Sequence, residues 1–409
     1  LTEISSPITV DFLSSANPLP SSITLTAADT SPSGSLQQLE RFEGMRVTVP
    51  SLTVIAPTGR ASINEPNATS TSNGLFYGVI TGIARPFREA GIAASDPLPP
   101  SSPCCIPRFD ENPERLRVDS DGQTGATALE VTAGAVVTNI TGPVDFGFRT
   151  YTLLPDPATP PSVSGNVSAG PVPVPAAGEA TVASWNLERF FDTVNDPNIG
   201  EPVLTTTAFN NRLNKASLAI RDVLRSPEIL GVVEVENLTT LQALATKIND
   251  DTVAGGGANP NYQAYLAEGN DVGGIDVGFL VKASRVGVLS ITQFGLTATY
   301  INPITGLPET LWDRPPYALE AVISPASGPA FPVTVIVNHL RSLSGIDDAV
   351  DGVRVRAKRR AEAEYLADLI QARQLASAGE RILAVGDFNA FQVSDGYVDL
   401  MGTIKGTPT

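Results

Sequence analysis

Cysteine and histidine, residue types that often build crosslinks and metal sites, are almost absent from this chain. Its 409 residues include two cysteines, adjacent at Cys104 and Cys105, and a single histidine, His339. Neighbouring cysteines seldom bridge each other because the bond would be strained, and a zinc site would need more ligands close by. We therefore interpret the pair as buried or loop thiols, and the low cysteine content leaves the redox compartment open.

Long apolar runs and an excess of positive charge are also missing. No apolar run approaches the ~20 residues that cross a membrane as a helix, so no membrane span is expected. Lys and Arg number 27 against 43 Asp and Glu, giving a formal net charge of −16. This balance argues against a protein that coats DNA passively, since such a protein would be basic. It leaves open an enzyme that handles nucleic acid at a bound metal, because the metal and a few arginines offset the repulsion locally.

What the chain does have is a clear division at residues 156–178, which are rich in proline, alanine and glycine. This composition predicts an extended, semi-rigid linker. Residues 1–155 hold short β-branched or aromatic runs broken by Pro, Gly, Ser and Asn, which predicts an all-β barrel or sandwich. In residues 179–409, apolar strands at 181–185, 229–235, 276–281, 332–338 and 381–385 alternate with helical patterns near 213–224 and 357–369. That alternation predicts a layered α/β domain.

The motif Gly386-Asp387-Phe388-Asn389 follows the last of these apolar strands. An Asp and an Asn two residues apart at a strand end point the same way, which places a carboxylate and an amide in one cleft. Such a pair suits a nucleophilic water and a developing oxyanion at phosphorus. The alternative is that Gly-Asp-x-Asn is only a turn.

Polar residues also mark two earlier strands. Asn186 directly follows an apolar strand, where it suits a metal-bound water or a phosphate oxygen; the alternative is a turn cap. Glu234 and Glu236 lie on the same face of another apolar strand, and burying a charge there is costly unless it is paired or binds a metal. Mg²⁺ is usually held by one or two carboxylates. We favour Glu234 as the ligand, with Glu236 and Asn237 behind it, over a pair of salt bridges.

Two basic residues suggest contacts to the substrate. His339 ends a strong β-run and precedes a basic loop, which favours catalysis over a structural role. Near neutral pH a histidine there protonates a leaving oxygen or stabilises the phosphorane. Arg314, beside two rigid prolines, suits a phosphate clamp, with a surface turn as the alternative. The basic run 354–360 either follows a nucleic-acid backbone or is a solvated helix face.

Taken in order, these motifs resemble those of the endonuclease/exonuclease/phosphatase superfamily, which includes deoxyribonuclease I. The resemblance covers about residues 180–409 and rests on Ser184-Trp185-Asn186-Leu187, Val233-Glu234, Arg314-Pro315-Pro316, Asn338-His339 and Gly386-Asp387-Phe388-Asn389. It implies an α/β four-layer sandwich with two central sheets facing each other and helices outside.

The same resemblance implies the roles of the site residues. The metal ligands are Glu234 and Asn186, the phosphate contacts are Arg314 and Asn186, and the catalytic residues are His339, Asp387 and Asn389, with Asn338, Glu236 and Asn237 in support. The implied metal is Mg²⁺, with Mn²⁺ or Ca²⁺ as alternatives.

An upstream stretch narrows the choice within that superfamily. Residues 39–45 and 74–78 resemble the oligonucleotide-binding-fold-like (OB-like) domain that precedes the nuclease domain in large bacterial extracellular nucleases. This looser resemblance covers about residues 35–155. It implies a nucleic-acid substrate, DNA more than RNA, and a secreted or cell-surface location, with no obligate protein partner evident.

One departure from the family pattern concerns the general base. The family carries an Asp-His pair after the Gly-Asp-x-Asn motif, and the histidine of that pair activates the attacking water. No such pair follows Asn389 in this chain, which begins at Leu1 and stops at Thr409. We therefore expect a processed or C-terminally truncated chain with incomplete central sheets that is inactive as given.

The sequence thus predicts a metal-dependent extracellular nuclease that cuts phosphodiester bonds by in-line attack of water. Two alternatives stay open. One is a sphingomyelinase-like enzyme or inositol-phosphate phosphatase of the same fold, which the upstream β-rich domain disfavours. The other is a catalytically dead nucleic-acid-binding protein, which the missing Asp-His pair supports.

Overall fold

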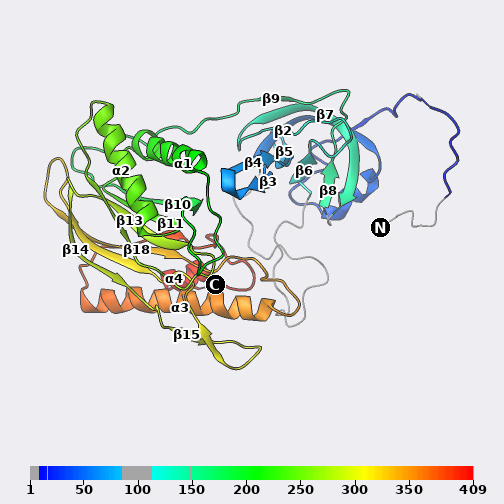
Figure 1. The fold of residues 1–409 in the computed structure, drawn as a ribbon. Coiled ribbons are helices and arrows are strands. Elements are labelled where there is room, and N and C mark those ends of the chain that lie inside the picture. Colours follow the sequence, from blue (N-terminus) through cyan, green and yellow to red (C-terminus); the bar gives the residue numbers. More distant parts are fainter. Residues whose placement is uncertain (1–8, 16, 85–112, 148–149, 409) are drawn as a thin grey trace. The chain divides into compact units, whose positions relative to one another are not determined.

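The computed structural model describes residues 9–15, 17–84, 113–147 and 150–408, so Cys104 and Cys105 lie outside the described residues. The described chain separates into two compact units (Figure 1). The first comprises residues up to 59, then 72–84 and 113–167. The second comprises residues 168–408 and also takes in residues 60–71, a hairpin from the N-terminal part of the sequence.

The first unit is β-rich, as predicted. Its sheet has the strand order β1 (Ile23–Thr24), β2 (Arg46–Ala56), β5 (Leu75–Ile80), β6 (Leu116–Asp119), β8 (Thr150–Leu153), β7 (Val136–Gly147) and β9 (Ser162–Ser164). Because β2 also pairs with β7, the sheet closes on itself. Alternate residues of β2, Val47 and Val49 among them, are buried in the core of this unit, together with the 3-10 helix η1 (Leu36–Phe42).

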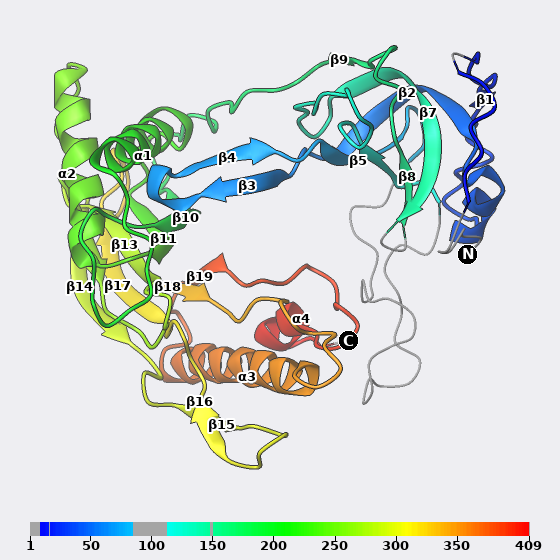
Figure 2. The ribbon, with the colours of Figure 1, turned by 45° about the vertical axis from the view of Figure 1, so that its right-hand side comes forward.

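The second unit contains two four-stranded sheets that face each other (Figure 2). One has the order β10 (Val182–Phe190), β11 (Ile229–Val235), β13 (Asp276–Lys282), β12 (Tyr262–Leu266), and the other β14 (Val286–Gln293), β17 (Tyr317–Ile323), β18 (Phe331–His339), β19 (Ile382–Asp387). Apolar side chains of both sheets form the core between them. Gly231 allows the close approach, because a Cβ there would lie 2.7 Å from Val385 Cγ2. The five strands predicted from the sequence are all present.

Helices pack on the outer face of each sheet. Helices α1 (Thr206–Leu218), which runs on into the π-helical turn η3 (Ala219–Val223), and α2 (Leu238–Ala254) cover the first sheet. Helices α3 (Gly352–Ala376) and α4 (Leu400–Lys405) cover the second (Figure 1). The remaining strands form two small hairpins, β3 (Arg60–Asn64) with β4 (Thr69–Ser72), and β15 (Thr299–Ile301) with β16 (Pro308–Thr310). In the described part of the chain, no helix has the length and apolarity to span a membrane.

Candidate metal and phosphate site

Strand register brings the predicted site residues to one edge of the second unit. Strands β18 and β19 are parallel, and their last residues, His339 and Asp387, pair directly. Strands β10 and β11 are also parallel, and Asn186 pairs with Val233, one residue before Glu234. Because the carboxyl ends of parallel strands meet at the same edge, residues distant in sequence gather there.

Glu234 occupies a β-bulge that the sequence does not reveal. The pairing of β11 with β13 shifts between Val233 and Val235, and Glu234 has a φ of 61°. A left-handed backbone at a non-glycine residue costs of order 1 kcal/mol or more and persists where the surroundings impose it. The bulge breaks the simple alternation along β11 and re-aims the Glu234 side chain.

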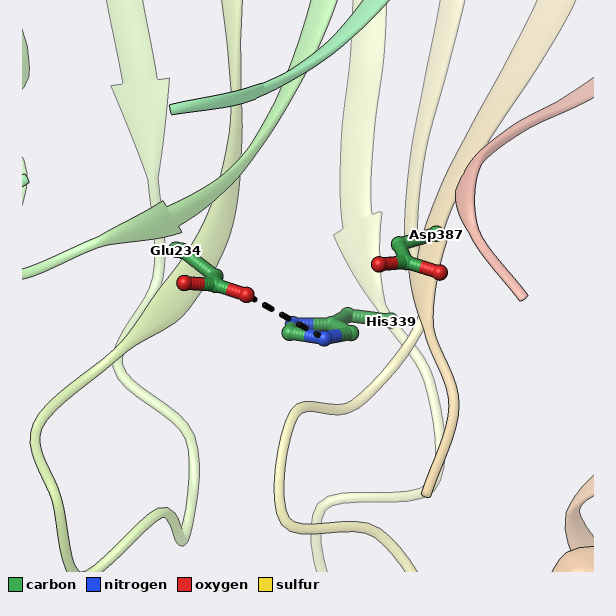
Figure 3. A group of neighbouring side chains, drawn as sticks. All are labelled: Glu234, His339 and Asp387. Carbon is green, nitrogen blue, oxygen red and sulfur yellow. Dashed lines mark ion pairs between the residues drawn. The ribbon is translucent and has the colours of Figure 1, made fainter. Parts of the chain in front are cut away.

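Glu234, His339 and Asp387 form a compact cluster (Figure 3). One ligand atom from each lies within 4.8 Å of the others, and His339 Nε2 is 3.9 Å from Glu234 Oε1. Asn186 Nδ2 joins the two carboxylates, donating to Glu234 Oε1 at 2.9 Å and to Asp387 Oδ2 at 3.2 Å. Asn186 therefore presents its amide nitrogen to the cluster, because its Oδ1 accepts from the backbone N–H of Glu188 at 2.7 Å.

The imidazole of His339 is held neutral. The side chain is buried, and burial lowers its pKa to about 4, with further lowering by the Arg314 guanidinium and opposition from Glu234 and Asp387. Its Nδ1 is buried without a hydrogen-bond partner among the described residues. A neutral imidazole accepts a proton or offers an electron pair to a cation.

Arg314 is a buried, paired cation and not part of a surface turn. Its Nη1 lies 2.5 Å from Asp271 Oδ2, and its Nη2 donates to the carbonyl of Leu340 at 3.4 Å. Asp271 therefore stands beside the site, although sequence reasoning did not single it out. It follows Asn270 and precedes Gly273 and Gly274, a pattern that indicates a turn and hides the ion pair.

The Gly386–Asn389 motif is both a turn and part of the site. Gly386 has a φ of 119°, and a Cβ there would lie 1.9 Å from the carbonyl oxygen of Asn338, so only glycine fits. Asn389, with a φ of 48°, donates its backbone N–H to Asp387 Oδ1 at 2.8 Å and its Nδ2 to the Leu340 carbonyl at 2.9 Å. The turn thus orients the Asp387 carboxylate and ties it to the loop that follows His339.

The three residues predicted to stand behind the ligands brace the backbone. Asn338 Nδ2 donates to the carbonyl of Ile336 at 2.9 Å and, across to β19, to that of Val385 at 3.3 Å. Asn237 accepts from the backbone N–H of Thr240 at 2.8 Å and caps α2. Glu236 accepts from the backbone N–H of Asp192 at 2.6 Å, and burial raises its pKa to about 7. Its partners differ from those of Glu234.

Neither sequence-based interpretation of the basic run 354–360 describes its main members. Arg356, Lys358 and Arg359 are buried at the start of α3. Arg359 donates to the carbonyl of Arg341 at 2.5 Å and to that of Asn389 at 3.1 Å, so it holds the loops after β18 and β19 together. Lys358 Nζ lies 2.7 Å from Asp313 Oδ1. These cations serve the fold of the site because they are turned inward, away from solvent and from any nucleic-acid backbone.

Glu362, one turn of α3 further on, predicts a pH-dependent stability. Its carboxylate accepts from the backbone N–H of Arg341 at 2.7 Å, and burial raises its pKa from 4.5 to about 8. The folded protein therefore holds an extra proton between these values, so stability falls as pH rises from about 4.5 through 8. We expect the free energy of unfolding of Glu362→Gln, relative to that of the parent, to rise by about 2 kcal/mol or more between pH 5 and pH 9. Denaturant unfolding at the two pH values measures this difference.

Glu364→Gln is the matched control for that measurement, since Glu364 is exposed on the same helix. Its stability should follow the parent at every pH. If the free energy of unfolding of Glu362→Gln and that of the parent change with pH in parallel, the Glu362 carboxyl is not protonated in the folded state.

Two stretches of the chain match models of known protein families. Residues 181–304 match the profile described as "Endonuclease/Exonuclease/phosphatase family". These residues, less than half of the chain, are similar to that family. The matched range includes Asn186 and Glu234. Enzymes of that family hydrolyse phosphate esters. Residues 19–164 match a domain of unknown function, DUF8508.

Solved structures that resemble part of the chain were also found. They include the human Nocturnin catalytic domain with bound sulfate (16% identity, 48% of this chain and 62% of that one, TM-score 0.30). A second is TDP2 of D. rerio with single-stranded DNA product (15% identity, 55% of this chain and 64% of that one, TM-score 0.31). A third is a mannosyl-6-phosphatase of Bacteroides thetaiotaomicron (13% identity, 56% of this chain and 70% of that one, TM-score 0.33). The chain thus spans less than two thirds of the first two. No curated protein matches the chain.

Proposed function

We propose that the second unit hydrolyses phosphodiester bonds of nucleic acid with the help of a divalent cation. The observation that carries this proposal is the cluster of Glu234, His339 and Asp387. Among the described residues, no Lys or Arg side chain forms an ion pair with either carboxylate of this cluster. Two neighbouring carboxylates whose partners are the uncharged donors of Asn186 and the backbone, with a neutral imidazole close by, favour a bound cation.

The donor set fits a hard cation. Glu234 and Asp387 offer carboxylate oxygens, the ligand type that Mg²⁺ prefers, and Asn186 holds both in place from a single amide. We propose Mg²⁺ as the metal, with Mn²⁺ or Ca²⁺ as alternatives. When bound, such an ion polarises the phosphate and stabilises the leaving oxygen.

The remaining residues surround the position of a phosphate. His339 places a neutral imidazole next to Glu234, where it takes up or returns a proton at the phosphoryl oxygens. Arg314 supplies a positive charge that is shared with Asp271. Asn389 is tied to Leu340 and fixes the loop after His339. These contacts support in-line attack by water on a phosphate diester.

The proposal also covers the fold type of each unit, the location of the protein and its substrate class. Two facing sheets with helices outside support a four-layer sandwich of the deoxyribonuclease I type, and the closed sheet of the first unit supports an OB-like domain. The acidic composition suits secretion. We propose a nucleic-acid substrate, DNA over RNA; the β-rich upstream unit favours nucleic acid over lipid or inositol phosphates.

The test is nicking of supercoiled plasmid by the 409-residue chain. With Mg²⁺ we expect slow nicking that chelator abolishes. His339 is the only histidine, and a missing general base costs about 10²–10⁴-fold in rate, so added imidazole should speed the reaction. Sphingomyelin vesicles and an inositol phosphate are assayed in parallel.

Each other outcome overturns a stated part of the proposal. Lipid or inositol-phosphate turnover without nicking replaces the substrate class. Plasmid binding without cutting, with or without imidazole, favours a nucleic-acid-binding protein on the same fold. Nicking that survives chelator removes the metal from the mechanism.

A further inference from the structure

The second unit contains a cavity of about 660 Å³ that the proposed chemistry does not use. It is lined by residues of β10, α1 and the tip of the β3–β4 hairpin, among them the half-buried Trp185 and the buried Phe190. Both side chains pack with α1 and α2 on the outer face of the first sheet. The volume is in the range of small-molecule sites, about 300–1,000 Å³.

The hairpin closes one side of this cavity. Its tip, the 3-10 turn η2 (Glu65–Asn67), lies against the start of α1 (Figure 2). The carbonyl of Pro66 accepts from the backbone N–H of Thr205 at 2.8 Å, and Glu65 lies 3.3 Å from Arg189. Ala68 packs against an apolar cluster of the second unit that includes Phe191 and the first turn of α1. The hairpin is therefore a fixed wall of the cavity.

The lining of the cavity combines apolar and polar side chains. The polar lining residues include three asparagines, Asn67, Asn211 and Asn214, and one lysine, Lys215. In the described part of the chain, none of these three amides makes a hydrogen bond and Lys215 forms no ion pair. An amide offers a donor and an acceptor side by side, which matches the edge of a nucleobase. A base stacks on aromatic rings, and a lysine suits the adjoining phosphate.

The cavity wall continues directly to the carboxylate cluster. Arg212, which lines the cavity, donates from Nη2 to the carbonyls of Leu187 and Glu188, both at 2.6 Å, and from Nη1 to that of Arg189 at 3.1 Å. The backbone N–H of Arg189 donates in turn to Glu234 Oε2 at 2.9 Å. One short segment of β10 thus separates the cavity from the metal ligands.

We propose that this cavity binds a nucleobase of the substrate strand, beside the phosphate held at the Glu234–His339–Asp387 cluster. The base lies over Trp185, its edge meets the asparagine amides, and Lys215 contacts the next phosphate. The hairpin from the N-terminal part of the sequence thereby takes part in substrate selection. This inference rests on the proposed function for the identity of the strand, and on the cavity for the base.

The test measures binding without turnover. Trp312 is fully buried in the second core and Trp185 lines the cavity, so a change in tryptophan fluorescence reports on Trp185. Titration of the full chain with a single-stranded hexathymidylate in chelator should give saturable quenching. Asn211→Ala combined with Lys215→Ala should weaken this binding about 5–100-fold, the scale of one lost side-chain contact to a base edge. Both residues are exposed on α1, so the fold should persist.

Lys405→Ala is the matched control, because Lys405 is an exposed lysine near the end of another helix. It should bind as the parent does. Absence of quenching, or equal affinity of the double variant and the parent, overturns the base site even if plasmid is nicked. Quenching that the double variant loses supports the base site even if no plasmid is nicked, so the two proposals fail separately.

Discussion

Replacing Glu234 by glutamine is expected to weaken Mg²⁺ binding by about 100-fold or more, since even a group that only orients a metal ligand is worth 10–100-fold. The change keeps the size of the side chain and its hydrogen bond from Asn186 Nδ2, but it removes the charge that faces Asp387 and His339. Isothermal titration of the full chain with Mg²⁺ measures the affinity directly and does not depend on turnover. Any Mg²⁺-dependent nicking should fall in parallel.

Glu236→Gln is the matched control for this change. Glu236 is two residues away, but its carboxyl group accepts from the backbone N–H of Asp192, and burial raises its pKa to about 7, so it is only partly ionised at neutral pH. The Mg²⁺ affinity of this variant should stay within about twofold of the parent. A twofold change corresponds to about 0.4 kcal/mol, which is the size of effect expected from a substitution that removes no contact to the metal. Equal losses in the two variants would contradict the assignment of Glu234 as the ligand.

Replacing Arg359 by methionine is expected to lower the free energy of unfolding of the second unit by about 3–5 kcal/mol, the cost of breaking a buried ion pair by removing one partner. Arg359 is fully buried, and its Nη2 lies 3.1 Å from Asp395 Oδ2. The substitution strands the Asp395 carboxylate and leaves the carbonyls of Arg341 and Asn389 without their donor. Denaturant unfolding followed by tryptophan fluorescence measures the loss, because both tryptophans belong to this unit.

Arg360→Met, at the next position of α3, is the control. Arg360 is exposed, and its replacement should change stability by no more than about 0.5 kcal/mol. Arg359→Lys should fall between the parent and Arg359→Met, because it keeps the charge but loses the planar fork that reaches two loops. If Arg359→Met and Arg360→Met are equally stable, the buried guanidinium does not hold the site loops together.

Much of the second unit could be predicted from local pattern. Apolar runs such as 229–235 and 332–338 became β11 and β18, because burial on both faces requires continuous apolar side chains. The polar residues at their ends stood out for the same reason: a charge or an amide there has no packing role. Asn186, Glu234, His339 and Asp387 were found in this way, and the fold does bring them together.

Other features depended on contacts between distant segments. The partner of Arg314 is Asp271, in a loop whose glycines indicate only a turn. The basic run of α3 resembles a solvated face by composition, yet Arg359 is fully buried because loops carrying Arg341 and Asn389 cover it. The hairpin at residues 60–71 lies within a β-rich sequence, but its tip packs on α1.

The sequence alone therefore determined five strands and two helices of the second unit and the polar residues at the strand ends. Periodicity decides these features, because it fixes which face of an element each side chain occupies. The tertiary structure decided the bulge at Glu234, the neutral state of His339, the inward arginines and the cavity beside Trp185. Each of these depends on which distant segments pack together, and that choice minimises the free energy of the whole unit, which no local stretch of sequence reports.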